Sequence, residues 1–149
     1  MGFQKISLKG RALRLLAGRE HSRAELERKL APHEEAPGDL KRALDDLQAK
    51  GFIDEQRVIE SVVHRRAARL GAQRVRQELQ AKGLAPDAVA QAVAALQGTE
   101  VQRAREVWRK KFGEPAVDAA GRARQMRFLA TRGFGGDTIR RVIGGSDDD

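Results

Sequence analysis

The stretch Glu78-Leu79-Gln80-Ala81-Lys82-Gly83-Leu84 decides the fold, because a related stretch follows fifty residues later. The second copy reads Phe128-Leu129-Ala130-Thr131-Arg132-Gly133-Phe134. Both copies place a leucine, a basic residue, a glycine and an apolar residue in the same order, and an Asp and two aliphatic residues follow each copy at matching positions. A helix, its glycine stop and the start of the next helix therefore form a repeated unit.

A looser copy lies near the N-terminus, where Glu25-Leu26-Glu27-Arg28-Lys29-Leu30 lacks the glycine and precedes a longer loop. We predict three tandem three-helix repeats at residues 7–53, 54–98 and 99–143, followed by an acidic tail at 144–149. A repeat of about 45 residues buries too little apolar surface to be stable alone. We therefore expect the repeats to stack into an elongated, curved array.

Apolar residues recur at spacings of three and four along almost the whole chain, which predicts an all-α protein. We expect nine helices. They cover residues 8–17, 22–30, 39–50, 54–70, a short segment around 75–79, a segment that opens at Pro86 and closes at Gly98, 99–112, 117–132 and 137–143. Ser22 to Glu25 and Thr99 to Gln102 match the capping-box pattern of a helix start, and Gly71 is interpreted as a helix stop.

Composition narrows the classes of function. The chain has 149 residues, 29 Lys and Arg against 21 Asp and Glu, a net charge of +8, three histidines and no cysteine. Disulfide scaffolds, thiolate zinc sites and cysteine nucleophiles are thereby excluded. No membrane span or signal peptide is recognisable, so we expect a cytoplasmic protein. The positive excess favours an anionic partner.

Positive charge is distributed over all three repeats, with net values of +3, +2 and +3 when the tail is counted with the third. Arg outnumbers Lys by 21 to 8, which favours bidentate docking to carboxylate or phosphate. We expect a long binding face. Its candidate residues are Arg65, Arg66, Arg69, Arg74, Arg105, Arg109, Lys110, Arg124, Arg127 and Arg140.

Catalysis finds little support in the sequence. His21, His33 and His64 have no neighbours at a persuasive metal-ligand spacing, and we expect them at the surface or at helix caps. Acidic pairs such as Asp45-Asp46 diverge around a helix. We predict no catalytic residue, no metal site and no cofactor.

Direct binding of nucleic acid is the alternative use of the charges. Stacking on single strands needs exposed aromatic rings, and this chain has one Trp, five Phe and no Tyr. Trp108 and Phe112 share an apolar helix stripe, and Phe52, Phe128 and Phe134 occupy repeat-equivalent apolar positions, which favours core packing for all five. The glycine-containing turns also resemble helix-turn-helix units, but any stacked helical hairpin has this pattern.

Three ordered blocks resemble the RecX family of regulatory proteins. The first is Leu16-Ala17-Gly18-Arg19-Glu20-His21-Ser22-Arg23-Ala24-Glu25-Leu26 with Gly51-Phe52-Ile53-Asp54. The second is Arg69-Leu70-Gly71 with the stretch from Glu78 to Leu84, and the third is Lys110-Lys111-Phe112 with the stretch from Arg127 to Phe134. Glu55 stands where the family usually has Asp, and the tyrosines common in the family are absent.

This resemblance implies a non-enzymatic modulator, usually an inhibitor, of the RecA recombinase. Family members lodge in the groove of the RecA filament on single-stranded DNA and suppress ATP hydrolysis, strand exchange and repressor co-cleavage. For this chain the resemblance implies a role in DNA repair, DNA recombination and the SOS response. We expect a monomer whose partner is the RecA filament, with at most weak contact with single-stranded or duplex DNA.

Overall fold

The computed structural model describes residues 5–144, and within them the chain forms nine α-helices, one 3-10 turn and no strand. The elements are α1 (Leu8–Gly18), α2 (Arg23–Leu30), η1 (Ala31–His33), α3 (Asp39–Ala49), α4 (Glu55–Arg66), α5 (Ala72–Ala81), α6 (Pro86–Gln97), α7 (Glu100–Lys111), α8 (Ala119–Thr131) and α9 (Gly136–Ile143). The predicted all-α fold is confirmed. Residues 145–149 of the predicted acidic tail lie outside the described residues.

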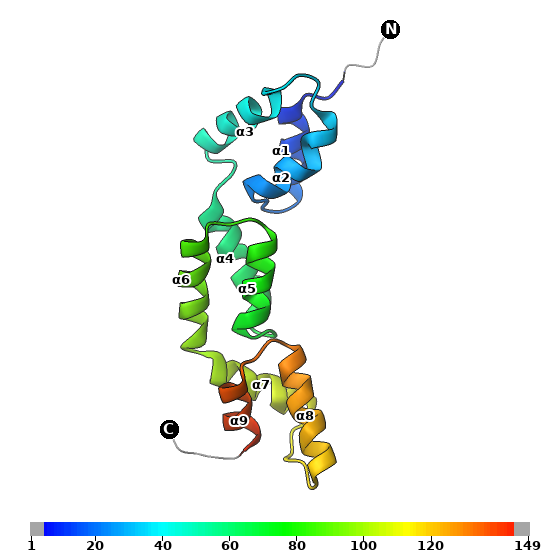
Figure 1. The fold of residues 1–149 in the computed structure, drawn as a ribbon, viewed down its shortest axis with the longest axis vertical. Helices are drawn as coiled ribbons and strands as arrows, with labels where there is room; N and C mark the ends of the chain where they lie inside the picture. The colour runs from blue at the N-terminus through cyan, green and yellow to red at the C-terminus, as the bar shows by residue number, and fades with distance from the viewer. Residues whose placement is uncertain (1–4, 145–149) are drawn as a thin grey trace.

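The helices form three modules stacked along one long axis (Figure 1). We call α1–α3 the first module, α4–α6 the middle module and α7–α9 the third module. Each has its own core: one is built around Leu26 and Leu44, one around Val75 and Leu79, and one around Leu129. The middle module lies to one side of the outer two in Figure 1, so the array is gently bent. Within residues 5–144, no helix is long and apolar enough to cross a bilayer.

The three middle helices α2, α5 and α8 run in a head-to-tail row along one side of the array (Figure 1). The C-terminal end of α5 meets the N-terminal end of α2, where the Ser22 hydroxyl donates to the Lys82 carbonyl. Arg28 Nη2 donates to the Ala81 carbonyl at 3.2 Å. Because the last carbonyls of a helix have no partner within it, these donors satisfy groups that would otherwise need water. We call this contact the first junction.

The second junction repeats this arrangement between α8 and α5. The Gly71 N–H, at the start of α5, donates to the Arg132 carbonyl at 2.8 Å, and Arg132 occupies the position after α8 that Lys82 occupies after α5. Gln73 N–H donates to the Gly133 carbonyl at 3.3 Å, and Arg74 Nη1 donates to Thr131 at 2.9 Å. At both junctions the negative end of one helix dipole faces the positive end of the next, which is favourable.

Gly71 is not the helix stop that the sequence predicted. It is the N-cap of α5, in extended conformation, and a Cβ on it would lie 2.4 Å from the Gly133 carbonyl carbon. The preceding helix α4 ends at Arg66 instead of residue 70. The chain turns there because Arg103 Nη1 binds the carbonyls of Ala67 and Leu70, each at 2.7 Å.

Three further expectations about local structure have different outcomes. Ser22 and Glu25 form the predicted capping box of α2. Thr99 makes no side-chain cap at the start of α7, because its hydroxyl donates to the Leu96 carbonyl. Phe52 is 46% exposed and not in the core, since the left-handed turn at Gly51 directs the chain so that Ile53, 2% exposed, fills the apolar position.

Candidate interaction surface

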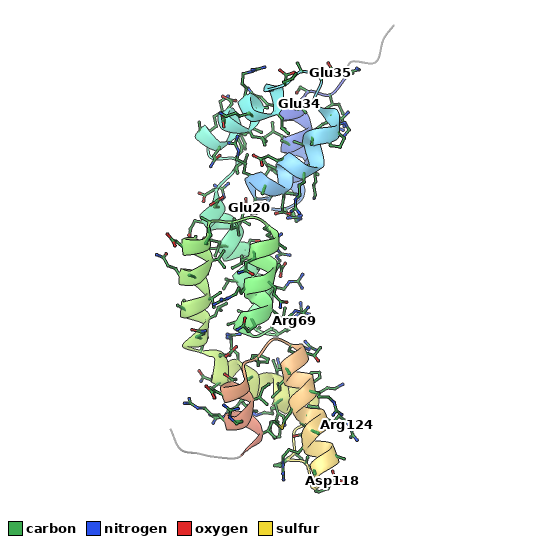
Figure 2. The ribbon with its side chains drawn as sticks, viewed as in Figure 1. Glu20, Glu34, Glu35, Arg69, Asp118 and Arg124 are labelled. Atoms are coloured by element: carbon green, nitrogen blue, oxygen red, sulfur yellow. The ribbon has the colours of Figure 1, made fainter. Side chains whose placement is uncertain are left out.

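The ten predicted contact residues are distributed over the middle and third modules. Arg65 and Arg66 end α4, Arg69 lies in the following turn, Arg74 is in α5, Arg105, Arg109 and Lys110 are in α7, Arg124 and Arg127 are in α8, and Arg140 is in α9. Figure 2 shows Arg69, at the end of the middle module, and Arg124, on α8, along the same side of the array. The ten residues therefore do not converge on one point.

Five of these ten residues already bind other groups of the chain, among them Arg65, whose Nε donates to the Ser61 carbonyl at 3.3 Å. Arg66 Nε lies 3.2 Å from Glu78 Oε2, and Arg109 Nη1 lies 3.0 Å from Glu106 Oε2. Arg140 pairs with Asp137 on the same helix. Arg74 supports the second junction through Thr131. The exposed pairs exchange readily with an external anion, because surface ion pairs are weak, whereas Arg74 has a structural role.

Arg69 and Lys110 line a common hollow of about 290 Å³ where the middle and third modules meet. We call it the basic hollow. The residues that line it are Ala68, Arg69, Glu106, Val107, Lys110, Lys111, Phe128 and Arg132. Three of these residues, Lys111, Phe128 and Arg132, were not among the predicted contacts.

Phe128 lines the basic hollow and contacts two of its cations. Lys111 Nζ lies 5.6 Å and Arg132 Cζ 4.9 Å from the centroid of its ring, which are cation–π distances. The edge-to-face partner of Phe128 is Phe112, with ring centroids 5.4 Å apart and planes at 86°. The expectation that Phe128 packs in a core is therefore met only in part, because its ring also carries two cations.

Within the described residues, four cations around the basic hollow form no ion pair. Among the ion pairs within residues 5–144, none involves Arg69, Lys110, Lys111 or Arg132, and Glu106 is paired with Arg109. Residues 99–144 as a whole carry eleven basic and five acidic side chains, a net charge of +6. Within the described residues, positive charge is thus most concentrated in the third module, and Asp147, Asp148 and Asp149 follow it in the sequence.

The sequence did not indicate the two buried carboxylates, Glu25 and Glu100, that connect neighbouring modules at the junctions. At the first junction Glu25 is buried, with Arg19 Nη2 at 2.7 Å and Lys82 Nζ at 3.3 Å. Burial alone would raise the pKa of Glu25, but hydrogen bonds from Arg19 and the Ser22 N–H, together with the charge of Lys82, lower it to about 2. This carboxylate stays ionised at neutral pH.

At the second junction the carboxylate is Glu100, which is 8% exposed. It accepts hydrogen bonds from the Ala72 N–H at 3.0 Å and the Thr138 hydroxyl at 2.8 Å. Arg103 lies one turn further along α7, and burial lowers the pKa of its guanidinium while Glu100 opposes the shift. These contacts fix α7, and with it the basic hollow, against the middle module.

His21 contradicts the expectation that all three histidines lie at the surface or at helix caps. It is 2% exposed, with Nδ1 3.0 Å from the Arg19 carbonyl and Nε2 3.0 Å from Lys29 Nζ. Burial lowers its pKa, although the bond to Arg19 opposes this shift. The neutral ring donates from Nδ1 and accepts from the Lys29 ammonium at Nε2, which is a structural role.

The described residues contain no group of three or more acidic or histidine side chains that could hold a metal ion. A hollow of about 800 Å³ lies in the first module between the N-terminal ends of α1 and α3. Several of its charges are paired, as in Lys5 with Glu35 and Arg42 with Asp39. Exposed ion pairs of this kind offer neither an activated nucleophile nor a perturbed acid–base pair.

Comparison with protein families assigns each module. Models of the first, second and third three-helix domains of RecX match residues 9–47, 54–93 and 99–143. The chain is 57% identical over 139 residues to the regulatory protein RecX of Leptothrix cholodnii, covering 93% of this chain and 88% of that protein. It is 48% identical to the regulatory protein RecX of Ralstonia nicotianae, covering 97% and 91%.

Solved structures show the same fold at much lower identity. The crystal structure of RecX from Lactobacillus salivarius superposes with a TM-score of 0.77 at 18% identity, over 94% of both chains. Another crystal structure of regulatory protein RecX gives a TM-score of 0.74 over 93% of this chain and 72% of that one. The family is one of regulatory proteins and not of enzymes. From its three matched domains and these relatives, the chain belongs to the RecX family of regulatory proteins.

Proposed function

We propose that this chain binds the RecA filament on single-stranded DNA and inhibits its ATPase, strand-exchange and co-protease activities in DNA repair and the SOS response. Membership of the RecX family over nearly the whole chain carries the proposal. The protein acts as a cytoplasmic monomer, and its functional units are the repeats at residues 7–53, 54–98 and 99–143.

The shape and charge of the array support this proposal. A row of three basic modules presents positive charge over a long distance, which suits a partner that repeats along an axis. A compact basic domain would instead suit a single small site. The exposed arginines of the middle and third modules are the proposed contacts, with Arg65, Arg69, Arg105 and Arg127 as members that have no acidic partner among the described residues.

Direct binding to nucleic acid is the second candidate, supported by the net charge of +8. Phe52 is exposed, but Trp108 and Phe128 argue against single-strand stacking. Trp108 donates its Nε1–H to Gln125 at 3.0 Å, and the ring of Phe128 is flanked by two cations. We therefore assign any DNA contact to phosphates and expect it to weaken steeply with salt.

The experiment measures the single-stranded-DNA-dependent ATPase of RecA with increasing amounts of the purified chain. We expect inhibition at less than one molecule per RecA protomer. Reversing Arg65, Arg69, Arg105 and Arg109 to Glu weakens inhibition strongly. Replacing the same four with Lys preserves the net charge and weakens inhibition less, because Lys keeps the attraction but not the bidentate hydrogen bonds. No inhibition by the wild-type chain at low salt contradicts the proposal.

A further inference from the structure

The third module departs from the middle module at one pair of equivalent positions. Arg66 is the last residue of α4 and Lys111 the last residue of α7, while Glu78 and Phe128 each lie three residues before the end of α5 and α8. In the middle module, Arg66 Nε meets Glu78 Oε2 at 3.2 Å. In the third module, an ammonium lies over an aromatic ring at 5.6 Å. A carboxylate has thus been replaced by a phenyl ring.

This replacement leaves the basic hollow with a surplus of positive charge. Lys111 and Arg132 both lie over the Phe128 ring, and Arg69 and Lys110 line the same hollow. None of these four takes part in an ion pair within residues 5–144. Cations gathered this closely repel one another, and an anion placed between them relieves that repulsion.

The lining of the basic hollow selects the kind of anion. Ala68, Val107 and Phe128 give it an apolar floor, and its volume of about 290 Å³ lies at the small end of ligand pockets. A nucleobase needs a free ring face on which to stack, but cations lie over the Phe128 ring and Phe112 packs edge-to-face with it. An acidic side chain that carries an apolar neighbour matches both the floor and the charged rim.

We propose that the basic hollow receives an Asp or Glu side chain of the partner protein, together with an adjacent apolar residue, in place of the carboxylate that the middle module supplies from Glu78. This inference rests on the proposed function, because it assigns a contact within the complex with the RecA filament. The partner's carboxylate binds between Arg69, Lys110 and Lys111, and its apolar neighbour contacts Val107 and Phe128.

The first test variant is Phe128→Glu, which restores the ion-pair pattern of the middle module and neutralises the hollow from within. The matched control is Met126→Glu, which places the same charge on the same helix at an exposed residue outside the hollow. We measure the affinity of each variant for RecA filaments on single-stranded DNA. Phe128→Glu weakens binding about tenfold and Met126→Glu less than about threefold.

Because Phe128 also packs against the core of the third module, a second variant keeps the test independent of folding. Arg69 and Lys110 are both exposed, and replacing both with Ala removes two cations of the hollow without touching the core. This double variant weakens filament binding about fivefold or more, with an unchanged thermal midpoint. Binding equal to that of the Met126→Glu control for both hollow variants overturns the inference while leaving the proposed function intact.

Affinity for free single-stranded oligonucleotide separates a protein carboxylate from a DNA phosphate. We expect the oligonucleotide affinity of Phe128→Glu to match that of Met126→Glu, because both variants change the net charge equally. A loss specific to Phe128→Glu and as large as its loss on filaments assigns the hollow to phosphate and overturns the carboxylate assignment. A wild-type chain that does not bind filaments at all overturns the proposed function and this inference together.

Discussion

Glu25 joins two modules through a single carboxylate. It closes the capping box of α2 within the first module, and its oxygens also meet Arg19 and Lys82, the latter from the middle module. Its ionised form is therefore favoured by partners from both sides of the junction. A residue with this role couples the stability of the junction to pH.

Replacing Glu25 with Gln lowers the free energy of unfolding at pH 7 by about 2–3 kcal/mol, because Lys82 and Arg19 then lose their buried partner. The folded-state pKa of Glu25, about 2, lies below its unfolded value of 4.5. The stabilisation is therefore fully present above about pH 4.5 and is lost as the pH falls towards 2. Urea unfolding of both proteins across this range checks the prediction.

The matched control is Glu27→Gln on the same helix. Glu27 pairs with Arg23 at 3.1 Å, and about half of its side chain is exposed, so the substitution costs less than about 0.5 kcal/mol. If the difference between wild type and Glu25→Gln stays constant from pH 7 to pH 3, the assigned role of Glu25 is wrong.

Local patterns made some of these residues predictable. Ser22 and Glu25 are three apart, and their capping box depends only on each other, so the sequence predicts it correctly. Glu100 follows Thr99 in a similar pattern, yet its partners Ala72 and Thr138 lie 28 and 38 residues away. No local pattern reports such contacts. His21 was misjudged for the same reason, because burial by the packing of neighbouring elements decides its environment.

At the scale of the elements, α5 and α8 meet through two glycines. Gly71 keeps an ordinary negative φ, so an alanine there meets no backbone strain of its own. The obstacle is space, since a Cβ would lie 2.4 Å from the Gly133 carbonyl carbon and 2.5 Å from the Phe134 nitrogen. Both of these atoms belong to backbone, which cannot move aside as a flexible side chain can.

Replacing Gly71 with Ala separates the third module from the middle one. We expect a loss of about 2 kcal/mol or more in the free energy of unfolding, because the hydrogen bonds from Gly71 and Gln73 to the end of α8 are broken. Hydrogen exchange checks this prediction, since the amides of Gly71 and Gln73 lose their protection while those in the middle of α2 keep theirs.

Gly18→Ala is the control for this prediction. A Cβ on Gly18 meets no atom within 4 Å, and Gly18 lies in α1. The substitution therefore stabilises the chain by up to about 1 kcal/mol. Equal effects of the two glycine substitutions contradict the assigned close approach at Gly71.

Helix periodicity predicts most elements because it depends on neighbouring residues, but it does not place every helix end. The apolar spacing continues past Arg66 to Leu70, so the sequence predicts a longer α4. The helix ends early because a distant side chain, Arg103, binds the carbonyls of the turn. The end of α4 is thus a tertiary feature, and it is this turn that places Arg69 beside α7.

At the scale of the whole molecule, three small hydrophobic cores stabilise the fold in place of the one large core of a compact globular protein. The core of the third module contains only Ala104, Leu129, Phe134 and Ile139 as buried members. The polar contacts at the second junction therefore contribute a large part of the stability of the third module. An elongated array with this construction exposes more surface than a compact chain of the same length.

Small-angle X-ray scattering tests this arrangement in solution. A compact chain of 149 residues has a radius of gyration of about 15 Å. We expect a clearly larger value for this protein, and the same value at low and high salt, because hydrogen bonds and buried carboxylates hold the junctions. A radius of gyration near 15 Å means that the modules fold back on one another.

The sequence predicts that the candidate surface is basic, but it does not predict which basic residues form it. Counting charges identifies a basic protein with several possible contacts, of which Arg69 and Lys110 line the basic hollow. The count cannot tell that Arg74 serves a junction or that Arg66 has a carboxylate partner, because both facts depend on residues in other helices. The exchange of Glu78 for Phe128 between the repeats was visible in the sequence, and it was the signal that could have indicated the hollow.

Because α2, α5 and α8 lie head to tail, the two ends of their row are chemically different. A further helix end packed against α8 would need a hydrogen-bond donor at the N-cap of α8, as Ser22 and Gly71 provide at the N-caps of α2 and α5. Asp118 stands there, and its carboxylate already accepts the Gly121 N–H at 2.7 Å. An incoming helix end presents carbonyl oxygens, which Asp118 repels. The N-terminal end of α8 therefore differs from the two junctions, because it presents a carboxylate where they present hydrogen-bond donors.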